Sequence, residues 1–454
     1  MWPSLNSSIP LLCIDNLYDY NRDFLNRYEG LRETKDLFQN LCTRLMCYGG
    51  LPKLVVSQKP AILYNYLREH LELQGDIFVI PDETGGSTVE KIFQSPMALK
   101  RIVTFSGPQK ELQIISWAGT SDMWDLAEHL EEQFCITVTL PETPSKENLW
   151  IQQYLDTKHG FRSVVSTTFC PEEKVLPEGF ICLNKHEMFG AIKWFLSRHE
   201  DCIVKPTRGL LGKGIFTFDA KNSYNEDEMQ IIFDSQDYFF AKDPIIVEQR
   251  IHSGSNKTLS PSVEYYIPPK IKGNPVFTCL VNQVFDDEVC FVGNIISKEL
   301  YGAPWCSSLF KKGDRLTRKV QDLGYVGYMD IDCVVDENNN VYFVEINPRR
   351  TGGTHIHEIA VQLFGENYIQ EVVLIDNSHL EVRGIHSCEQ LYSKTIDLLY
   401  IPRQQKKGII ITNANLLASY GIISALSIGK DEGEANHCLL EFQERIYPKD
   451  IVEI

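Results

Sequence analysis

Apolar and polar positions follow two kinds of pattern along the first part of the chain. Short apolar runs typical of strands occupy residues 53–58, 76–81, 102–106 and 112–117, and helical spacing occurs at 60–73 and 123–133. Strands that alternate with helices indicate an α/β layer. We therefore expect residues 1–145 to form an N-terminal α/β domain.

The proline-containing linker at residues 141–146 is expected to introduce a second unit. Helical spacing follows at 147–159, 185–198, 314–323 and 352–363, and strand-like runs occupy 201–206, 244–248, 276–284 and 289–297. The tail has strand-like runs at 395–401 and 408–412 and an apolar stretch at 416–426. We predict a middle domain over residues 146–380, with a flap subdomain over 200–250, and a small C-terminal subdomain over 385–454.

The most informative segment is a pair of apolar runs, 328–335 and 341–346, that carry a few acidic side chains. Asp330 and Asp332 interrupt the first run, and Glu345 interrupts the second. The intervening Asp-Glu-Asn-Asn-Asn has the composition of a turn. A two-residue turn at positions 338 and 339 would make Asp332 face Glu345 and Asp330 face Asn347 across a hairpin.

This register gathers the polar side chains on one face of the hairpin, with opposite Cβ atoms about 5 Å apart. Two carboxylates at that distance repel each other unless a cation lies between them. Carboxylate oxygens with a nearby amide suit Mg²⁺, whose other ligands are usually waters and substrate phosphates. We predict a metal site at Asp332, Glu345 and Asn347. The alternative, a solvated hairpin edge, is disfavoured by the apolar flanks.

Two further strand ends carry charged side chains. Lys205 ends an apolar strand, and three glycines follow at positions 209, 212 and 214, which would let backbone N–H groups approach phosphate oxygens. The loop is not a Walker A motif, and an ordinary β-turn is the alternative. Glu248 closes another apolar strand and, with the backbone after it, could bind an adenine edge; an ordinary strand end is the alternative.

Taken in order, these segments resemble the ATP-grasp superfamily. Its pattern is V-K-P before a glycine-rich flap, V-E-x-x-I at a hinge, a strand with Asp, and E-I-N-x-R. The corresponding residues here are Val204-Lys205-Pro206, Val247 to Ile251, Asp332, and Glu345 to Arg349. The resemblance covers residues 145–365 and implies an α/β (α+β) protein: an ATP-grasp fold behind an N-terminal pre-ATP-grasp domain. With its short C-terminal part, the layout is similar to the pheganomycin-type peptide ligases.

The resemblance also implies roles for individual residues. The phosphates of ATP would meet the flap, at Gly212 and Gly214, and three lysines, Lys205, Lys213 and Lys298. The nucleoside side would meet Glu248, Ile251 and Glu264. Mg²⁺, or Mn²⁺ in its place, would be held by Asp332, Glu345 and Asn347. Arg349 would meet the γ-phosphate or acyl phosphate and, with Lys205, would be catalytic.

One position departs from the family pattern. Many amino-acid ligases of this superfamily carry Arg two residues before the metal-binding Asp, where this chain has Asp330. Arg350 and Arg315 are the candidates for the missing positive charge. His355 or His357 could deprotonate an amine substrate, although a packed histidine is the favoured alternative.

The implied activity is ATP- and Mg²⁺-dependent ligation of a carboxylate to an amine through an acylphosphate, with amino acids or a short peptide as substrates. The alternatives are a kinase that stops at phosphate transfer, a thioester-forming ligase, and an ATP-binding regulator without turnover. The intact pair of metal-binding carboxylates argues against the regulator without turnover.

Length, charge and cysteine content limit the classes of partner that we expect. The 454 residues suggest about three domains. The formal net charge of −17 disfavours nucleic-acid binding, which needs clustered Lys and Arg. No apolar run reaches the ~20 residues of a membrane span, the first residues lack the basic region of a signal peptide, and the thirteen cysteines are scattered, as expected for buried thiols. We expect a cytoplasmic protein that binds a small-molecule or peptide substrate and no membrane; a homodimer is left open.

Overall fold

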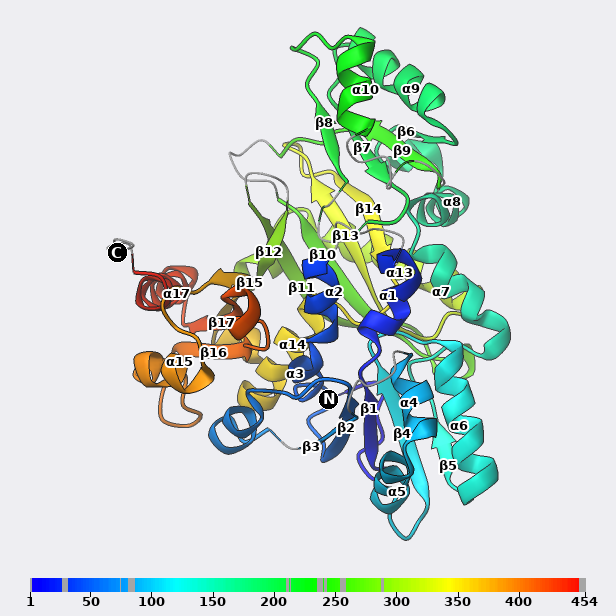
Figure 1. The fold of residues 1–454 in the computed structure, drawn as a ribbon. Helices are drawn as coiled ribbons and strands as arrows, with labels where there is room; N and C mark the ends of the chain where they lie inside the picture. Colours follow the sequence, from blue (N-terminus) through cyan, green and yellow to red (C-terminus); the bar gives the residue numbers. More distant parts are fainter. Residues whose placement is uncertain are drawn as a thin grey trace.

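The computed structural model describes residues 2–26, 32–73, 75–80, 86–209, 212, 214–234, 240, 243–253, 259–286 and 290–448. Within them three sheets carry the architecture, one parallel and two antiparallel (Figure 1). No helix in these ranges is both long and apolar enough to cross a membrane.

The N-terminal sheet is parallel, as the alternation of strands and helices predicts. Its order is β3-β2-β1-β4-β5, formed by β1 (Leu11–Ile14), β2 (Lys53–Ser57), β3 (Asp76–Val79), β4 (Glu111–Ser116) and β5 (Thr137–Thr139). The helices around it are α1 (Leu17–Asn26), α2 (Arg32–Gln39), α3 (Cys42–Leu45), α4 (Thr88–Gln94), α5 (Pro96–Phe105) and α6 (Ser121–Phe134).

One predicted strand in this domain is wrong. Residues 102–106 lie at the end of α5 instead. Ser95 caps this helix by accepting a hydrogen bond from the Ala98 N–H, and Pro96 occupies its first position, where the missing N–H costs nothing. The predicted helix at 60–73 is also only partly formed, since its regular part is a short π-helix at Tyr66–His70.

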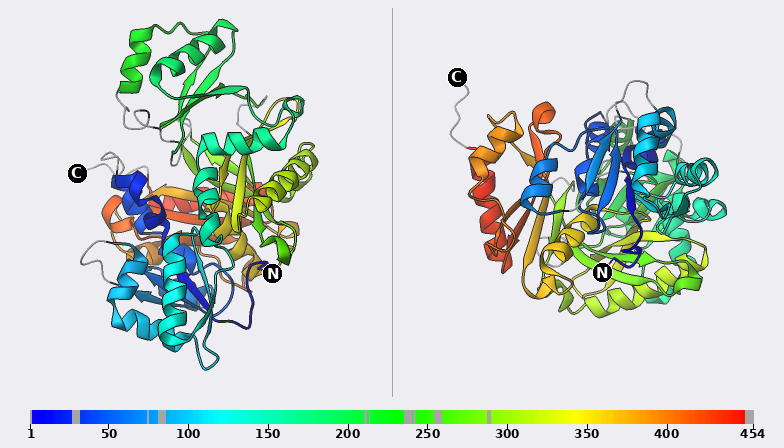
Figure 2. Two further views of the ribbon diagram at one scale, coloured as in Figure 1. Left: turned by 90° about the vertical axis from the view of Figure 1, so that its right-hand side faces the viewer. Right: turned by 90° about the horizontal axis from the view of Figure 1, so that it is seen from below.

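A smaller antiparallel sheet includes three strands from the segment 200–250, predicted as a flap, and one strand that precedes it. Its order is β6-β9-β7-β8, from β6 (Gly179–Cys182), β7 (Cys202–Pro206), β8 (Phe216–Phe218) and β9 (Ile245–Gln249), with α9 (Lys185–Ser197) and α10 (Glu226–Asp234) beside it. This unit projects away from the N-terminal sheet at the top of Figure 1, and the left-hand view of Figure 2 shows the same separation.

The largest sheet has eight antiparallel strands in the order β14-β13-β10-β11-β12-β15-β17-β16. They are β10 (Pro261–Ile267), β11 (Val276–Phe285), β12 (Phe291–Ile296), β13 (Gly327–Val335), β14 (Val341–Asn347), β15 (Val373–Glu381), β16 (Gly408–Asn413) and β17 (Ile422–Gly429). The remaining α-helices are α7 (Leu149–Leu155), α8 (Lys158–Thr168), α12 (Lys298–Tyr301), α13 (Cys306–Asp322), α14 (Gly352–Phe364), α15 (Cys388–Thr395), α16 (Leu417–Tyr420) and α17 (Glu432–Ile446).

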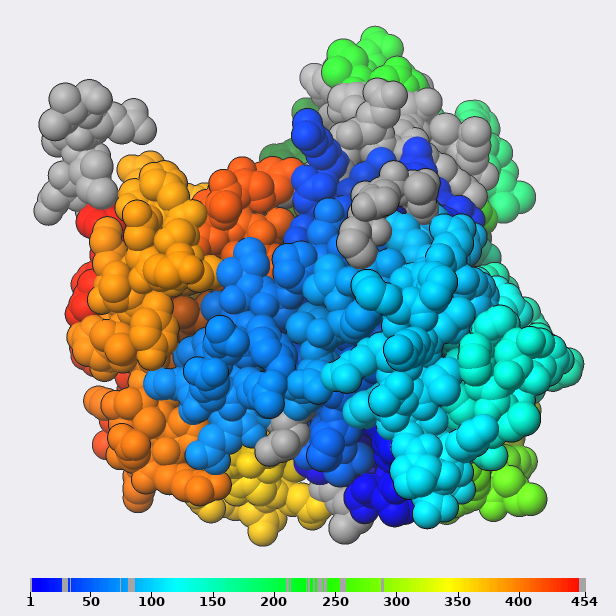
Figure 3. All heavy atoms as spheres, turned by 60° about the horizontal axis from the view of Figure 1, so that its bottom comes forward, coloured from blue at the N-terminus to red at the C-terminus, as the bar shows by residue number. Residues whose placement is uncertain are grey.

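The C-terminal strands β16 and β17 extend the same sheet that carries the acidic hairpin, because β17 pairs with β15 along much of its length. The strand predicted at 395–401 is wrong: α15 ends at Thr395, and Leu399 makes only an isolated bridge to Ile409. The C-terminal residues also pack against the N-terminal domain, as the orange and blue atoms of Figure 3 show. Asn415 accepts a hydrogen bond from the Ile62 N–H and donates one to the Pro60 carbonyl.

Candidate active site

The acidic hairpin forms with the predicted facing pairs but through a different connection. Asp332 is opposite Glu345, and Asp330 is opposite Asn347. Val335 pairs with Val341, so the loop has an odd number of residues, 336–340, rather than a two-residue turn. A β-bulge between the Asp332–Glu345 pair and the Val335–Val341 pair shifts the register by one residue. Because of this shift, Asp332 still faces Glu345.

Neighbouring strands and one helix supply polar partners to this face. Gln283 on β11 donates to Asp332 Oδ1 (3.1 Å), and Asn347 Nδ2 donates to Asp332 Oδ2 (3.1 Å). Lys158, the first residue of α8, donates from Nζ to Glu345 Oε1 (2.7 Å). Burial, followed by the charges of Asp330 and Glu345, raises the pKa of Asp332 well above its usual value. Burial and the neighbouring acids therefore make Asp332 hold its proton more readily than an exposed carboxyl group does.

The donor set fits a hard divalent cation. Asp332 and Glu345 offer carboxylate oxygens, and Asn347 still has its amide oxygen, since its nitrogen makes the bond to Asp332. Within the described ranges no group of three or more His, Cys, Asp or Glu side chains could hold a metal by itself. Two carboxylates and an amide suit Mg²⁺, which takes its remaining ligands from water and substrate phosphates.

Lys205 comes from a different sheet and is held by a buried ion pair. Its Nζ bonds Glu248 Oε1, and Arg162 Nη1 donates to the other oxygen, Oε2 (2.6 Å). The antiparallel pairing of β7 with β9 brings the two strand ends together. The Glu248 carboxylate is thus occupied by two cations, and the N–H groups of Gln249 and Arg250 donate to backbone carbonyls. The carboxylate of Glu248 consequently positions Lys205 rather than pointing freely at a ligand.

Glu264 on β10 lies opposite Asp330 on β13. Thr278 donates to Glu264 Oε1 (2.9 Å), and Thr354 on α14 donates to Oε2. Burial raises the pKa of Glu264 to about 7 and that of Asp330 to about 7. Two buried carboxyl groups on adjacent strands each disfavour ionisation of the other, so this pair retains a proton more readily than exposed acids do.

One cavity of about 950 Å³ joins these groups. It is lined by most of the predicted site residues, Lys205, Gly212, Glu248, Ile251, Glu264, Asp332, Glu345, Asn347 and Arg349. Gly214 is not among the lining residues, and neither is Lys298, which is exposed at the start of α12. Lys213 lies outside the described residues. The structure therefore brings together side chains from the hairpin and the flap but leaves Lys298 apart.

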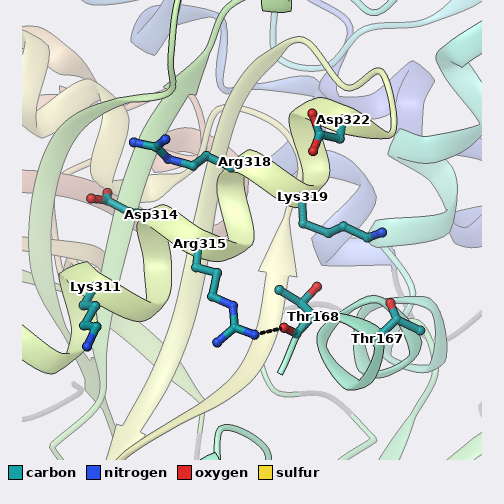
Figure 4. Close-up of a pocket in the computed structure, with 8 residues that line it drawn as sticks. All are labelled: Thr167, Thr168, Lys311, Asp314, Arg315, Arg318, Lys319 and Asp322. Carbon is teal, nitrogen blue, oxygen red and sulfur yellow. Dashed lines mark hydrogen bonds between the residues drawn. The ribbon is translucent and has the colours of Figure 1, made fainter. Parts of the chain in front are cut away.

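The two candidates for the missing positive charge at position 330 are both paired with other groups. Arg350 is buried, donates to Glu142 and Glu358, and lies between the rings of Tyr48 and Tyr328. Arg315 points from α13 towards Thr168, as Figure 4 shows, at a separate surface pocket of about 480 Å³. Arg315 is wrong as a candidate because it lies at another pocket, whereas Arg350 lines the same cavity as Asp330 and stays a prediction.

The two histidines after the Gly-Gly turn are packed in the interior. This is the alternative that the sequence favoured over a role as a base. Burial lowers the pKa of His357 to about 4, and its Nδ1 lies 3.0 Å from the Tyr368 hydroxyl. Burial also lowers the pKa of His355 well below its usual value.

Several cavity residues carry no signal in the sequence. Lys158 is the first residue of α8, and the pattern around it is that of a helix start, where Thr157 caps α8 by accepting from the Gly160 N–H. Gln283 lies in a strand in which nothing about the neighbouring residues marks this position as functional. Arg349 is held by Asp156 (2.6 Å), which follows α7. These partners come from remote segments, so only the folded chain identifies them.

Comparisons with known proteins agree with this geometry. Residues 190–353 match the ATP-grasp domain family. The N5-carboxyaminoimidazole synthetase of Staphylococcus aureus, complexed with ADP, has a TM-score of 0.56 at 11% identity, over 97% of this chain and 98% of that one. The biotin carboxylase–β-γ-ATP complex of Campylobacter jejuni has a TM-score of 0.57 at 13% identity, over 94% and 89%.

A third similar structure is the biotin carboxylase domain dimer of the Hydrogenobacter thermophilus 2-oxoglutarate carboxylase, in complex with MgADP, ADP and bicarbonate. It has a TM-score of 0.52 at 12% identity, over 93% of this chain and 86% of that one. No curated protein matches the sequence. The chain therefore has an ATP-grasp fold with a parallel N-terminal domain in front, as the motifs predict.

Proposed function

We propose that the chain is an ATP- and Mg²⁺-dependent ligase that joins a carboxylate to an amine through an acylphosphate and releases ADP and phosphate. The observation that carries the proposal is the convergence of Asp332, Glu345 and Asn347 with Lys205 on one cavity, although they belong to two sheets. The likeness to proteins crystallised with ADP, an ATP analogue or MgADP supports a nucleotide there.

In this proposal Asp332, Glu345 and Asn347 hold Mg²⁺, or Mn²⁺ in its place. When bound, the ion supplies positive charge that stabilises the phosphate oxygens during transfer. Lys158 lies against Glu345 and adds a further charge on the same side. Lys205, fixed by Glu248, reaches the phosphates together with Gly212, which lines the same cavity.

Phosphoryl transfer depends mostly on positioning and electrostatic stabilisation, which suits a site without a side-chain nucleophile. The substrate carboxylate attacks the γ-phosphate, and an amine then attacks the acylphosphate carbon, expelling phosphate. Arg349, oriented by Asp156, is placed to meet the acylphosphate. Ile251 and Glu264 line the same cavity, and their contact with the nucleoside is proposed from the family resemblance. Amino acids or a short peptide as substrates remain a prediction from the pheganomycin-type layout, as does a homodimer.

The test is ADP release by the purified protein with pools of amino acids and short peptides, with mass spectrometry of the products. Release that requires both an acid and an amine, with an amide in the products, supports the proposal. A phosphorylated product that is stable without an amine would instead indicate a kinase. A thioester product would indicate a thioester-forming ligase. ATP binding without turnover in every pool would indicate a regulator.

A further inference from the structure

The N-terminal domain contributes mostly apolar side chains to the cavity. They are Leu17 on α1, Leu37 and Phe38 on α2, Leu41 just after α2, and Trp117 directly after β4. Leu37 is only partly buried, and the other four are buried side chains that still border the cavity. In the described part of the chain, Arg44 is the only polar residue that this domain adds to the lining. We call the five apolar residues the apolar wall.

The proposed reaction leaves the apolar wall without a role. Mg²⁺, the phosphates and the acylphosphate are all charged, and the nucleoside is assigned to Glu248 and Ile251 at the end of β9. In Figure 1, α1 and α2 lie between the parallel N-terminal sheet and the smaller antiparallel sheet that contains β9. Apolar surface in a ligand cavity binds the apolar parts of a ligand, because both surfaces then leave water. The wall therefore fits an apolar part of a substrate.

The apolar wall lies beside the residue assigned to the acylphosphate. The Trp117 carbonyl accepts a hydrogen bond from the Arg350 N–H (3.0 Å), and Arg350 directly follows Arg349 in the chain. Asn16 holds Leu17 at the same place, because its Oδ1 accepts a hydrogen bond from the Trp117 N–H (3.0 Å). The wall thus begins one residue away from Arg349.

Arg349 also lies close to the metal-binding face. Its guanidinium pairs with Asp156 (2.6 Å), and the charge of Glu345 acts on it as well. Tyr20, on the same helix as Leu17, lies near the Asp156–Arg349 pair, since both charges act on its hydroxyl. A single arginine residue therefore connects the wall to the metal-binding face, so one small acid can contact both.

We propose that the apolar wall holds the side chain of the substrate whose carboxylate is activated, so that this acid is an amino acid with an apolar side chain or a peptide that ends in one. The inference rests on the proposed ligase function and narrows its substrate class. The carboxylate lies at Arg349 and the metal-binding face, while the side chain leaves water against Leu37 and Trp117. A polar side chain would lose its hydrogen bonds to water there, because the wall is apolar.

The experiment measures hydroxamate formation with ATP and Mg²⁺, using hydroxylamine in place of the amine substrate. Hydroxylamine attacks the acylphosphate carbon and expels phosphate, so the rate reports on the acid alone. The acids are pairs of nearly equal size, leucine with asparagine and valine with threonine, supplied free and as the last residue of a dipeptide. In the unaltered protein we expect kcat/KM to be about ten- to a hundredfold higher for the apolar member of each pair.

Three variants test the wall itself. Leu37→Asn should reduce the preference at least about tenfold by raising KM for the apolar acid, with KM for ATP unchanged. Leu37→Met keeps an apolar side chain and should keep the preference. Leu99→Asn is the matched control, because Leu99 is another partly buried leucine on a helix of the same domain, α5, and does not line the cavity.

Equal kcat/KM within each pair, a preference for the polar member, or a preference that survives in Leu37→Asn would overturn the inference. The thermal midpoint shows whether each variant is folded. If Leu37→Asn is not, Leu37→Ala removes less of the packing and should change the preference in the same direction.

Failure of the ligase function is a separate outcome. If no acid yields a hydroxamate or ADP, the ligase proposal fails on its own. Calorimetric binding of the same acids then decides whether the cavity has an apolar site. Tighter binding of the apolar member that is lost in Leu37→Asn supports the site, and equal binding within each pair rejects it.

Discussion

In this site, ion pairs hold the positively charged side chains in place, and the carboxylates of the hairpin face lie close together. Lys205 and Arg162 share Glu248, and Arg349 is held by Asp156. Buried ion pairs add little to the stability of the folded protein because both charges lose their hydration. Their value here is positional, because they fix the direction of side chains that would otherwise be flexible.

The crowded carboxylates lead to a first prediction. The double change Asp332→Asn with Glu345→Gln keeps side-chain volume but removes both negative oxygens from the hairpin face. We expect ADP release to fall at least about a hundredfold, because the charge that would hold the cation is lost. The thermal midpoint at neutral pH should be unchanged or higher, since two repelling groups are removed. The exposed loop change Glu337→Gln is the control, and normal activity in the double variant would rule out the metal assignment.

A second prediction concerns pH. Burial raises the pKa of Asp15, at the end of β1, from 3.8 to about 7. The folded state therefore holds this proton more tightly than the unfolded state, and stability contributed at low pH is lost as pH rises from about 4 to 7. In Asp15→Asn this loss is absent, so the urea midpoint should decline less between pH 5 and pH 8. A decline as steep as in the unaltered protein, or the same flattening in the exposed variant Glu132→Gln, would contradict it.

At the scale of elements, the site depends on how strands are joined rather than on any one turn. The bulge in β14 compensates for the odd loop, so Asp332 and Glu345 remain opposite. The pairing of β12 with β15 similarly links the hairpin half of the sheet to the C-terminal half. Gly293 on β12 lies at this junction, where a Cβ would meet the Asp376 carbonyl oxygen at 1.9 Å.

The third prediction follows from that close approach. Gly293→Ala forces the two strand backbones apart, and overpacking of this kind typically costs about 1–3 kcal/mol. We expect a lower urea midpoint and weaker hydrogen-exchange protection in β12 and β15. Gly190→Ala is the matched control, because a Cβ on Gly190 in α9 meets nothing within 4 Å and alanine favours a helix. Equal midpoints for the two variants would show that the junction is not tight.

At the scale of the whole molecule, the first and last parts of the chain are packed together. His70 Nε2 lies 3.1 Å from the Tyr400 carbonyl, and Arg44 reaches Ser378. One hydrophobic core cluster includes residues from Leu11 to Ile446. The C-terminal residues thus contribute β16 and β17 to the sheet and Glu432, at the start of α17, to the wall of the cavity.

The fourth prediction tests whether residues 385–454 behave as a separate subdomain, a boundary that stays a prediction. Removal of residues 384–454 would leave β15 as an unpaired edge and expose apolar side chains such as Leu374. We expect residues 1–383 to aggregate or to lose cooperative unfolding, measured by light scattering and thermal denaturation. A soluble monomer with the full-length midpoint would show instead that the C-terminal residues fold independently.

Local patterns allowed much of this protein to be predicted. The alternation of strands and helices indicated the parallel N-terminal sheet. The acidic positions within two apolar runs indicated a hairpin with Asp332 opposite Glu345, and this facing holds only because a β-bulge offsets a loop that is longer than the predicted two-residue turn. The strand predicted at 102–106 was wrong since the capping signals of Ser95 and Pro96 outweigh a short apolar run.

The sequence by itself determined the family pattern, the fold, and the ligand types on the hairpin, since these depend on short segments whose chemistry is local. Tertiary structure decided which charges are occupied: Glu248 is taken by Lys205 and Arg162, and Arg350 by Glu142 and Glu358. It also placed Arg44 in the cavity, beside a strand more than three hundred residues away in the chain. Such pairings arise from contacts between remote segments, and no local periodicity encodes them.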